Sequence, residues 1–255
     1  MGFLQDRCIC LRKVEYSETS QILSLFGRTH GVVRVIAKGA HRKTKAGASK
    51  FGGGIDLLDV GSAVFTDRLE KDMATLTEWE LLEGHPDLRN SLRGLYLGFY
   101  AAELVGLLIV EHDPHPKLFD QLEATLLELS GPRVEQAFVA FEMDLLRETG
   151  YLPEIQVCVS CGGNIQCRGS VSFVPARGGV VCRNCEGSYP ERLGIDGRIL
   201  GVLQYVMKLN GQDSRRLPLL TRHQSDPINR IIAEHVEQLL GKRLRTRKFV
   251  QGPRS

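Results

Sequence analysis

The sequence predicts an α+β protein of several domains: an N-terminal five-stranded β-barrel of the OB type, followed by an α-helical domain that carries an inserted four-cysteine ribbon. Three observations predict this fold class. The first eighty residues alternate short runs rich in Val, Ile, Leu, Thr and Phe with turn residues. Apolar residues then recur at helical spacing. Two Cys-x-x-Cys pairs interrupt the helical region.

The 255 residues are enough for one large domain or several smaller ones. We expect the barrel at residues 1–80, an α-helical domain at 81–156 and 187–241, the ribbon inserted at 157–186, and a basic C-terminal tail at 242–255.

The predicted barrel contains five β-rich runs. We expect strands at Arg7–Val14, Thr19–Phe26, Val32–Gly39, Ile55–Thr66 and Met73–Leu81. Five strands in so short a segment, with one long connection after the third, are typical of a Greek-key barrel of the OB type. A five-stranded SH3-like barrel is the main alternative.

The helical region has its own start and stop signals. We expect helices at Asp87–His112, Lys117–Leu129, Val134–Thr149 and Gly194–Asn210, and one more near the C-terminus. In the last helix, Asp226 is the expected N-cap, Pro227 the first helical residue and Gly241 the residue just past the end. In the second, Leu118, Leu122, Leu126 and Leu129 form one apolar stripe.

Nothing in the sequence predicts export or a membrane partner. The first residues lack the long apolar run of a signal peptide. Leu95–Val110 is the most apolar stretch but is shorter than the ~20 residues of a membrane span, so we expect a buried helix. Cys8 and Cys10 lie two apart on one strand face, where we expect small buried thiols. Reduced cysteines fit a reducing compartment, and we therefore expect a cytoplasmic protein.

The two cysteine pairs are the strongest chemical signal in the chain. Cys158 and Cys161 form the first pair, and Cys182 and Cys185 form the second, with twenty residues between the pairs. Two such turns supply the four thiolates that Zn²⁺ takes in closed structural sites, so we expect one structural zinc ion per chain. A site with four protein ligands has no open position for a substrate. Cys167 lies at no useful ligand spacing, and we expect it to be a spare thiol.

The residues between the pairs support a zinc ribbon. Ser170–Val174 is typical of a strand, Ala176–Gly179 of its turn, and Val180 and Val181 lead back into the second pair. Gly162 follows the first pair, where the backbone of a metal knuckle needs a positive φ.

Charge is segregated along the chain, although the net charge is only +3. Residues 80–150 carry thirteen acidic and five basic side chains, whereas residues 242–255 carry six basic side chains and no acidic one. This distribution indicates anionic partners at particular surfaces. The basic tail is either a phosphate contact or a complement to the dipole of the last helix.

A second basic segment, from residue 28 to residue 50, contains no acidic residue. Its lysines and arginines are Arg28, Arg34, Lys38, Arg42, Lys43, Lys45 and Lys50, with His30 and His41 among them. Because side chains alternate along a strand, Arg34 and Lys38 share one face of the third strand, opposite Val33, Val35 and Ala37. A cationic strand beside a basic loop favours phosphate backbones, and we assign all seven to nucleic-acid binding.

The aromatic residues are weaker evidence for nucleic-acid binding than the basic residues. Tyr16, Phe26, Phe51 and Phe65 are the candidates for base stacking, but we expect most of them to belong to the barrel core. The sequence favours no enzyme. It has no Gly-x4-Gly-Lys-Ser/Thr phosphate loop, no Gly-x-Ser-x-Gly elbow, and no His-x-Glu placed before a Pro-Cys-x-x-Cys.

The order of these parts resembles the RecO family of bacterial recombination mediators along nearly the whole chain. The residues that carry the resemblance are Glu15–Ser20, His30–Ala40, Glu80–Leu82, Gly150–Pro153 with the following Cys158–Gly162, and Leu244–Arg247.

The resemblance implies a function in DNA repair and homologous recombination. Members bind single- and double-stranded DNA, anneal complementary strands, contact the acidic C-terminal tail of single-strand-binding protein, and with RecR help to load RecA. It implies a bacterial protein of the cytoplasm, associated with the nucleoid. By position, the resemblance implies that Arg34, Lys38, Arg42 and Lys43 contact DNA. It also implies that the four ribbon cysteines are structural zinc ligands. Two alternatives from the residues alone remain: a zinc-ribbon RNA-binding protein of translation or RNA processing, and a zinc hydrolase.

Overall fold

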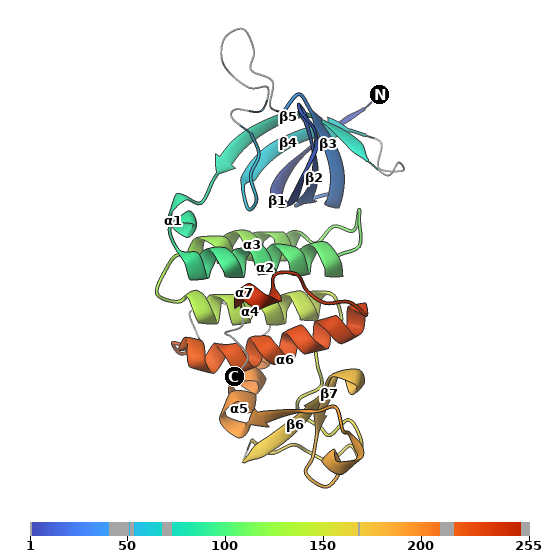
Figure 1. The fold of residues 1–255 in the computed structure, drawn as a ribbon, viewed down its shortest axis with the longest axis vertical. Helices are drawn as coiled ribbons and strands as arrows, with labels where there is room; N and C mark the ends of the chain where they lie inside the picture. Colours follow the sequence, from blue (N-terminus) through green and yellow to red (C-terminus); the bar gives the residue numbers. More distant parts are fainter. Residues whose placement is uncertain are drawn as a thin grey trace. The chain divides into compact units, whose positions relative to one another are not determined.

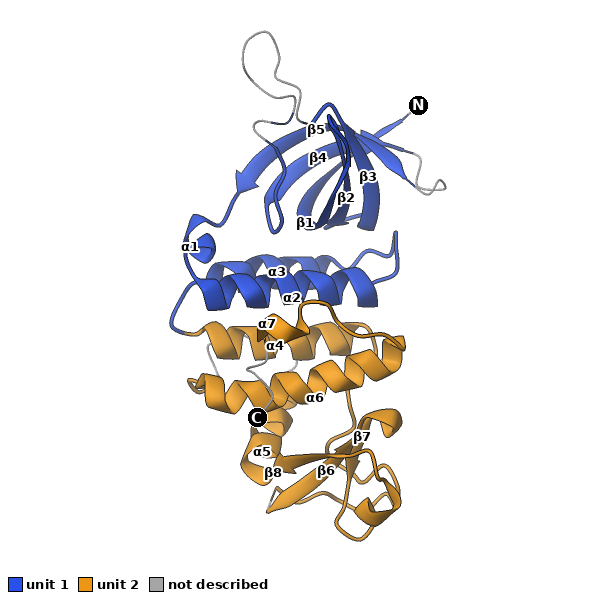
Figure 2. Ribbon diagram, in the orientation of Figure 1, with its two compact units in different colours: residues 1–132 blue, residues 133–255 orange. Residues whose placement is uncertain are grey.

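The computed structural model describes residues 2–40, 51, 54–67, 73–167, 169–209 and 217–250 (Figure 1). The chain divides into two compact units, residues 1–132 and residues 133–255 (Figure 2). Unit 1 contains a β-barrel and three helices, and unit 2 contains the remaining helices and a small β-sheet. None of the helices within these described ranges combines the length and the apolar content needed to cross a bilayer.

The barrel of unit 1 has the predicted topology. Its strands are β1 (Phe3–Ser17), β2 (Ser20–Gly27), β3 (Gly31–Lys38), β4 (Val60–Thr66) and β5 (Ala74–Glu83). They close in the order β1-β2-β3-β5-β4, with β3 and β5 parallel and the other pairs antiparallel. This Greek-key closure confirms the predicted OB-type barrel.

The fourth strand starts later than the sequence predicts. A turn precedes it, in which the Asp59 backbone N–H donates to the Asp56 carbonyl at 3.2 Å. The Asp56 N–H in turn donates to the Asp59 carboxylate at 2.8 Å. Because these groups are satisfied within the turn, the ladder between β1 and β4 begins only at Val60.

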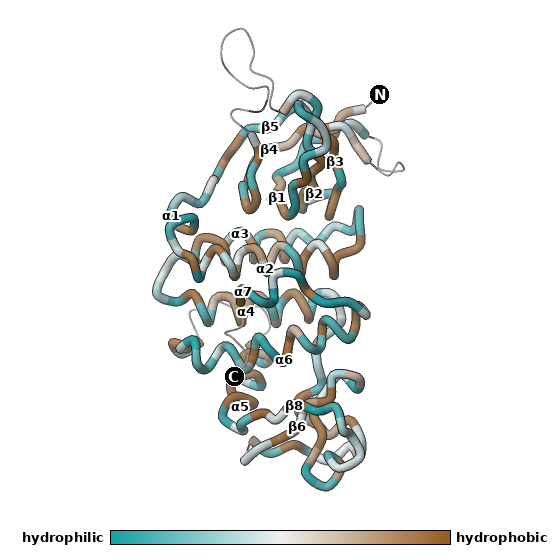
Figure 3. Tube along the Cα trace, in the orientation of Figure 1, coloured by the Kyte–Doolittle hydropathy of each residue, from teal (hydrophilic) through white to brown (hydrophobic). Residues whose placement is uncertain are grey.

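Alternating side chains build the barrel core, and Figure 3 shows the corresponding change of hydropathy along the strands. Leu23 and Leu25 of β2 face inward, and the intervening Ser24 is only partly buried. Cys8 and Cys10 belong to the same core cluster, which confirms that these thiols are buried. Burial raises the pKa of Cys10 to about 12, so the thiol stays protonated and unreactive.

Three helices complete unit 1: α1 (Pro86–Arg89), α2 (Leu92–Leu108) and α3 (Pro116–Glu128). The single helix predicted for Asp87–His112 is wrong. Ser91 interrupts it, because its hydroxyl accepts the Gly94 N–H at 3.2 Å and so caps the start of α2. The α2 helix packs against β1, and α3 lies beside α2 (Figure 1). The predicted leucine stripe of α3 is confirmed, since all four leucines are fully buried.

Unit 2 contains four helices among the described residues: α4 (Val134–Glu148), α5 (Gly197–Lys208), α6 (Arg222–Leu240) and α7 (Arg247–Val250). The α4 helix packs against α5 and α6. The residues predicted to open the fourth helix instead form a short strand, β8 (Leu193–Asp196). Asp196 then caps α5 by accepting the Arg198 N–H at 2.7 Å.

The predicted start of α6 is wrong. Thr221 is the N-cap, its backbone N–H donates to the Gln224 side chain at 2.9 Å, and Pro227 lies inside the helix. The Asp-Pro pair is a start signal, but a capping box five residues earlier starts the helix first. The extra turn gains a tertiary contact, since Ser225 donates to the Glu135 carboxylate of α4 at 2.5 Å. The end is as predicted, with Gly241 at φ 62°.

The ribbon forms a three-stranded sheet in the order β7-β6-β8. The predicted hairpin is confirmed: β6 is Ser170–Val174, a 3-10 turn follows at Pro175–Arg177, and β7 is Gly179–Val181. A second 3-10 turn, Glu186–Ser188, follows the second cysteine pair. The third strand, β8, was not predicted, because its four residues resemble the beginning of the helix that follows.

Candidate nucleic-acid interface and metal centre

The outward side of β3 carries two of the predicted DNA contacts. Arg34 and Lys38 are exposed, whereas the alternating residues Val33, Val35 and Ala37 are buried. No carboxylate of the described residues pairs with Lys38, and the nearest partner of Arg34 is Glu111, with 4.0 Å between guanidinium and carboxylate. Both side chains of that pair are about half exposed, so the contact is weak.

Arg28 lies in a different environment. Its guanidinium forms two parallel hydrogen bonds with the Asp120 carboxylate of α3, at 2.7 Å and 2.9 Å. This pairing raises the pKa of Arg28 and lowers that of Asp120. Arg7 of β1 pairs with Glu123, one helical turn further along α3. Two basic groups of the barrel therefore already have acidic partners within unit 1.

The other four predicted DNA contacts, Arg42, Lys43, Lys45 and Lys50, lie outside the described residues, as does His41. Two further basic residues of β1, Arg7 and Arg12, are exposed but were not predicted from the sequence. Arg12 pairs in register with Ser24, which pairs with Arg34. The register of β1 against β2 could have revealed Arg12. The β-bulge after Cys10 obscured that register, because it breaks the alternation of side chains along β1.

The turn between β2 and β3 is organised by one buried carboxylate. Asp6 accepts the backbone N–H groups of Thr29 and His30, at 3.0 Å and 2.9 Å, and contacts the His30 ring at 2.9 Å. The His30 ring also packs edge-on against Phe65. Because Asp6 fixes this turn, His30 has a structural role, although the sequence places it among the basic residues.

The structure divides the four aromatic candidates. Phe26, Phe51 and Phe65 are fully buried, as expected of barrel core. Tyr16 is 64% exposed and lies at the end of β1.

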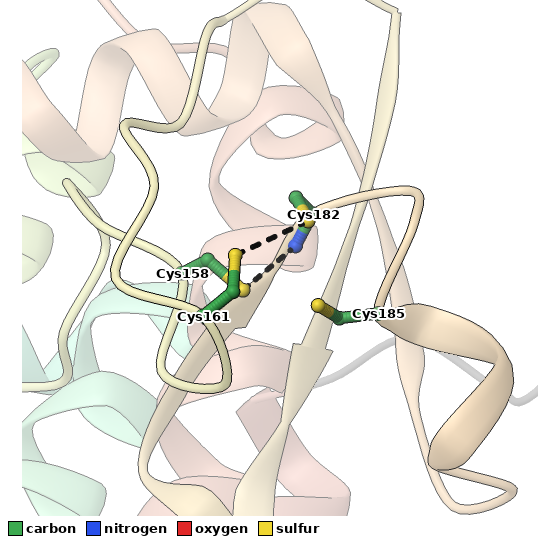
Figure 4. Close-up of side chains that lie close together, drawn as sticks. All are labelled: Cys158, Cys161, Cys182 and Cys185. Atoms are coloured by element: carbon green, nitrogen blue, oxygen red, sulfur yellow. Dashed lines mark hydrogen bonds between the residues drawn. The ribbon is translucent and has the colours of Figure 1, made fainter.

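The four predicted metal ligands converge at one point of unit 2 (Figure 4). The first knuckle closes when the Gly162 N–H donates to the Cys158 carbonyl at 2.8 Å, with Gly162 at φ 74°. The second closes when the Cys185 N–H donates to the Cys182 carbonyl at 3.0 Å. All four sulfur atoms lie within 4.8 Å of one another.

These thiols fit a tetrahedral metal ion. Sulfur atoms bonded at about 2.3 Å to a tetrahedral centre lie about 3.8 Å apart. Cys161 Sγ and Cys182 Sγ are 3.8 Å apart. The backbone N–H of Cys182 also donates to Cys158 Sγ at 3.3 Å, a bond that orients a thiolate ligand (Figure 4). The four cysteines could therefore hold one metal ion, and their sulfur atoms would occupy all four of its coordination positions.

Hydrogen bonding prepares one thiol for this role. Burial opposes ionisation of Cys158, but the backbone N–H groups of Cys182, Cys161 and Ser160 outweigh it and lower the pKa of Cys158 to about 6. Ser160 lowers the pKa of Cys185, but hydrogen bonding among the crowded thiols prevails and raises it to about 11. Four thiolates so close together repel one another, so full ionisation requires a cation. Cys167 is not in the group and donates to the Gln204 side chain at 3.0 Å.

Two side chains connect the ribbon to the helices of unit 2. His235 of α6 contacts the Tyr151 carbonyl through Nε2 at 2.8 Å and packs edge-on against Phe173 of β6. Burial lowers the pKa of His235. The Gln204 amide of α5 donates to the Ile155 carbonyl at 2.8 Å. These contacts therefore connect the ribbon and the segment before it to α5 and α6.

The C-terminal basic run has one residue turned inward. Arg247 is buried and pairs with the carboxylates of Glu234 and Glu237 on α6. Glu237 also accepts the Leu244 N–H at 2.8 Å. Through these contacts Arg247 holds the segment after α6 against that helix, and the two roles that the sequence leaves open for the tail stay predictions.

Comparison with known proteins is consistent over the whole length. Residues 1–85 match the family model "Recombination protein O N terminal", and residues 89–248 match "Recombination protein O C terminal". Proteins named "DNA repair protein RecO" are similar to the chain. One from Anaeromyxobacter sp. (strain Fw109-5) is 30% identical over 95% of this chain and 93% of its own. One from Rhodopirellula baltica is 36% identical over 71% of this chain and 66% of its own.

Proposed function

Because the chain belongs to the RecO family, we propose that it is a non-enzymatic mediator of DNA repair and homologous recombination. It binds single- and double-stranded DNA and anneals complementary strands. Together with RecR, it helps RecA to replace single-strand-binding protein on DNA. The observation that carries the DNA-binding part is the outward side of β3, where Arg34 and Lys38 are exposed beside the basic segment that follows in the sequence.

The proposed DNA surface comprises Arg28, Arg34, Lys38, Arg42, Lys43, Lys45 and Lys50. Arg34 and Lys38 contribute most among the described residues, because neither has a close acidic partner. Arg28 contributes least, since a phosphate must first replace Asp120. The cationic side chains screen two phosphate backbones and so allow complementary strands to approach each other.

The metal of the ribbon is zinc, one ion per chain, held by Cys158, Cys161, Cys182 and Cys185. Tetrahedral coordination by four thiolates is the arrangement of structural zinc sites, which supports this identity. The ion stabilises the ribbon and takes no part in a reaction. The domain limits given above remain part of the proposal, with β8 added to the ribbon at 157–186 because it pairs with β6.

The partners follow from the family: RecR, and the acidic C-terminal tail of single-strand-binding protein, which an exposed basic surface attracts. A pull-down with that C-terminal peptide tests the second partner. Retention of the protein supports the proposal, and no retention contradicts this part of it.

The DNA surface is tested by reversing two charges. The double variant Arg34→Glu with Lys38→Glu should bind every DNA sequence more weakly. The slope of log K against log salt should shrink by about one unit per lost contact. The control reverses the same number of charges in unit 2, with Arg183→Glu and Lys208→Glu, both exposed. An unchanged slope in the Arg34/Lys38 variant would remove these residues from the DNA surface.

The alternative is a zinc-ribbon protein that binds RNA. Competition between single-stranded RNA and DNA of equal length separates the two functions. Preference for RNA, together with failure to bind the single-strand-binding-protein peptide, would favour the alternative.

A further inference from the structure

The outward side of β1, β2 and β3 combines cations with an exposed apolar row. In strand register, Val14 of β1 lies opposite Ile22 of β2, and Ile22 lies opposite Ile36 of β3. We call these three residues the apolar row. Inward neighbours such as Gln21 and Leu23 are buried, whereas Val14 is 40% exposed and the two isoleucines are partly exposed.

Cations lie on both sides of the apolar row. On one side, Arg12 and Arg34 lie two residues before Val14 and Ile36 along their strands, and Ser24 separates them. On the other side, Lys38 lies opposite Ser20. Since strands are about 4.8 Å apart and rise about 3.4 Å per residue, this surface is roughly 10 Å by 13 Å.

Tyr16 completes the surface. It lies two residues beyond Val14 on β1 and is 64% exposed. The register of β1 against β2 shifts between Glu15 and Ser17, so Tyr16 is the extra residue of a bulge at the Ser20 end of the outward side. Its neighbour Glu15 faces the other way, because its carboxylate accepts the Gln21 amide at 2.9 Å. None of the paired outward positions of these rows carries an acidic residue. Glu111 lies 4.0 Å from Arg34, and exposed Glu18 lies in the turn between β1 and β2.

We propose that Tyr16 and the apolar row form a platform on which unpaired bases of single-stranded DNA stack, while Arg12, Arg34 and Lys38 hold the flanking phosphates. This inference rests on the proposed DNA-binding function and adds to it a preference for single strands. An exposed ring and aliphatic side chains enclosed by cations match the two parts of a nucleotide, a flat apolar base and an anionic phosphate.

The platform distinguishes single strands from duplexes for a physical reason. In a duplex the base faces are stacked on each other, so only phosphates are available to this surface. A single strand offers both base faces and phosphates. Once two strands have annealed, the contact with Tyr16 is lost, and the product remains bound through phosphates alone.

The test compares three variants on an oligonucleotide of about 16 nucleotides, the upper end of what one OB barrel covers. Tyr16→Ala removes the ring, and Tyr16→Phe keeps the ring without the hydroxyl. Phe3→Ala is the matched control, since Phe3 is 61% exposed on the same strand but pairs with Thr66 of β4 and lies away from the platform. Affinity is measured for single-stranded and duplex forms at several salt concentrations.

Tyr16→Ala should weaken single-strand binding by about fivefold or more, the loss of one base–aromatic stack. Duplex binding and the salt slope should not change, because no phosphate contact is removed. Tyr16→Phe and Phe3→Ala should bind like the unchanged protein.

Three results would overturn the platform: no loss of affinity with Tyr16→Ala, an equal loss for single strands and duplexes, or an equal loss with Phe3→Ala. The charge reversal at Arg34 and Lys38 separates these results from failure of the proposed function. If that reversal still weakens both DNA forms, DNA binding stands without the stacking platform. If it changes neither form, Arg34 and Lys38 are not part of the DNA surface, and if the unchanged protein binds neither form, the DNA-binding function itself fails.

Discussion

Arg28 and Asp120 are joined by two parallel hydrogen bonds, 2.7 Å from Nε to Oδ1 and 2.9 Å from Nη2 to Oδ2. Arg28 lies in the turn after β2 and Asp120 on α3, 92 residues later in the sequence. The acidic side chain occupies the same guanidinium edge that a phosphate would use. An arginine in the acid-free basic segment therefore has an acidic partner from the helices of its own unit.

Asp120→Asn should release Arg28. Because both side chains are about half exposed, stability should change little. DNA binding should strengthen, and the salt slope should steepen by about one contact. The control is Asp87→Asn, which removes an exposed acidic group from α1. If the two variants bind DNA alike, Arg28 gains no phosphate contact and its role is to hold α3 against the barrel.

Cys182→Ser should abolish retention of zinc, measured as metal per chain after dialysis. Loss of one of four ligands should also lower the stability of unit 2 by several kcal/mol, on the order expected when a structural metal is removed. Cys167→Ser is the matched control within the same ribbon, and it should keep one zinc ion per chain. Equal zinc content in the two variants would contradict the four-cysteine site.

Thiol labelling should distinguish three classes among the seven cysteines. In the zinc-loaded protein at pH 8, only exposed Cys167 should react quickly. After chelation, the four ligands should react as well. Cys8 and Cys10 should react only after unfolding, because burial raises both pKa values. Rapid labelling of more than one thiol before chelation would contradict this assignment.

Stability should decrease as the pH falls below about 6.5, the ordinary pKa of histidine. Burial lowers the pKa of folded His235, so the unfolded chain binds the proton more readily, and stability is fully present only above the unfolded pKa. His235→Gln keeps a donor for the Tyr151 carbonyl but does not titrate. Between pH 7.5 and pH 5.5, its denaturant midpoint should change less than that of the unchanged protein.

The control for this pH dependence is His223→Gln, which changes an exposed histidine of the same helix. It should keep the full slope. Buried His85 of unit 1 also has a lowered pKa and accounts for a residual slope in the His235 variant. Equal slopes for His235→Gln and His223→Gln would contradict the prediction.

Arg247→Ala should destabilise unit 2 by about 1–3 kcal/mol, because it leaves Glu234 and Glu237 without their buried partner. Thermal or chemical unfolding measures this loss. Arg243→Ala, in the exposed part of the same run, should have almost no effect on stability. A stable Arg247→Ala protein with weaker DNA binding would instead favour a phosphate contact.

The sequence by itself determined the parts whose signals are local. Alternation placed Arg34 and Lys38 outward on β3, Cys-x-x-Cys spacing identified the four cysteines that lie close together and could hold a metal ion, and leucine spacing defined the buried side of α3. Each of these patterns follows from the geometry of one strand, turn or helix. The α6 start was local too, but two competing signals, Asp226-Pro227 and Thr221 with Gln224, could not be ranked without the contact between Ser225 and Glu135.

Only the tertiary structure decided which charged and aromatic side chains remain available. Arg28 and Arg247 belong to basic runs, yet carboxylates from α3 and α6 pair with them. Tyr16 is exposed whereas Phe26 is buried, and Tyr16 lies beyond Ile9, the last residue of β1 that pairs with β4. The physical reason is that an ion pair or the burial of a ring depends on residues far apart in the chain. A one-dimensional pattern contains charge and period but no distance between such residues.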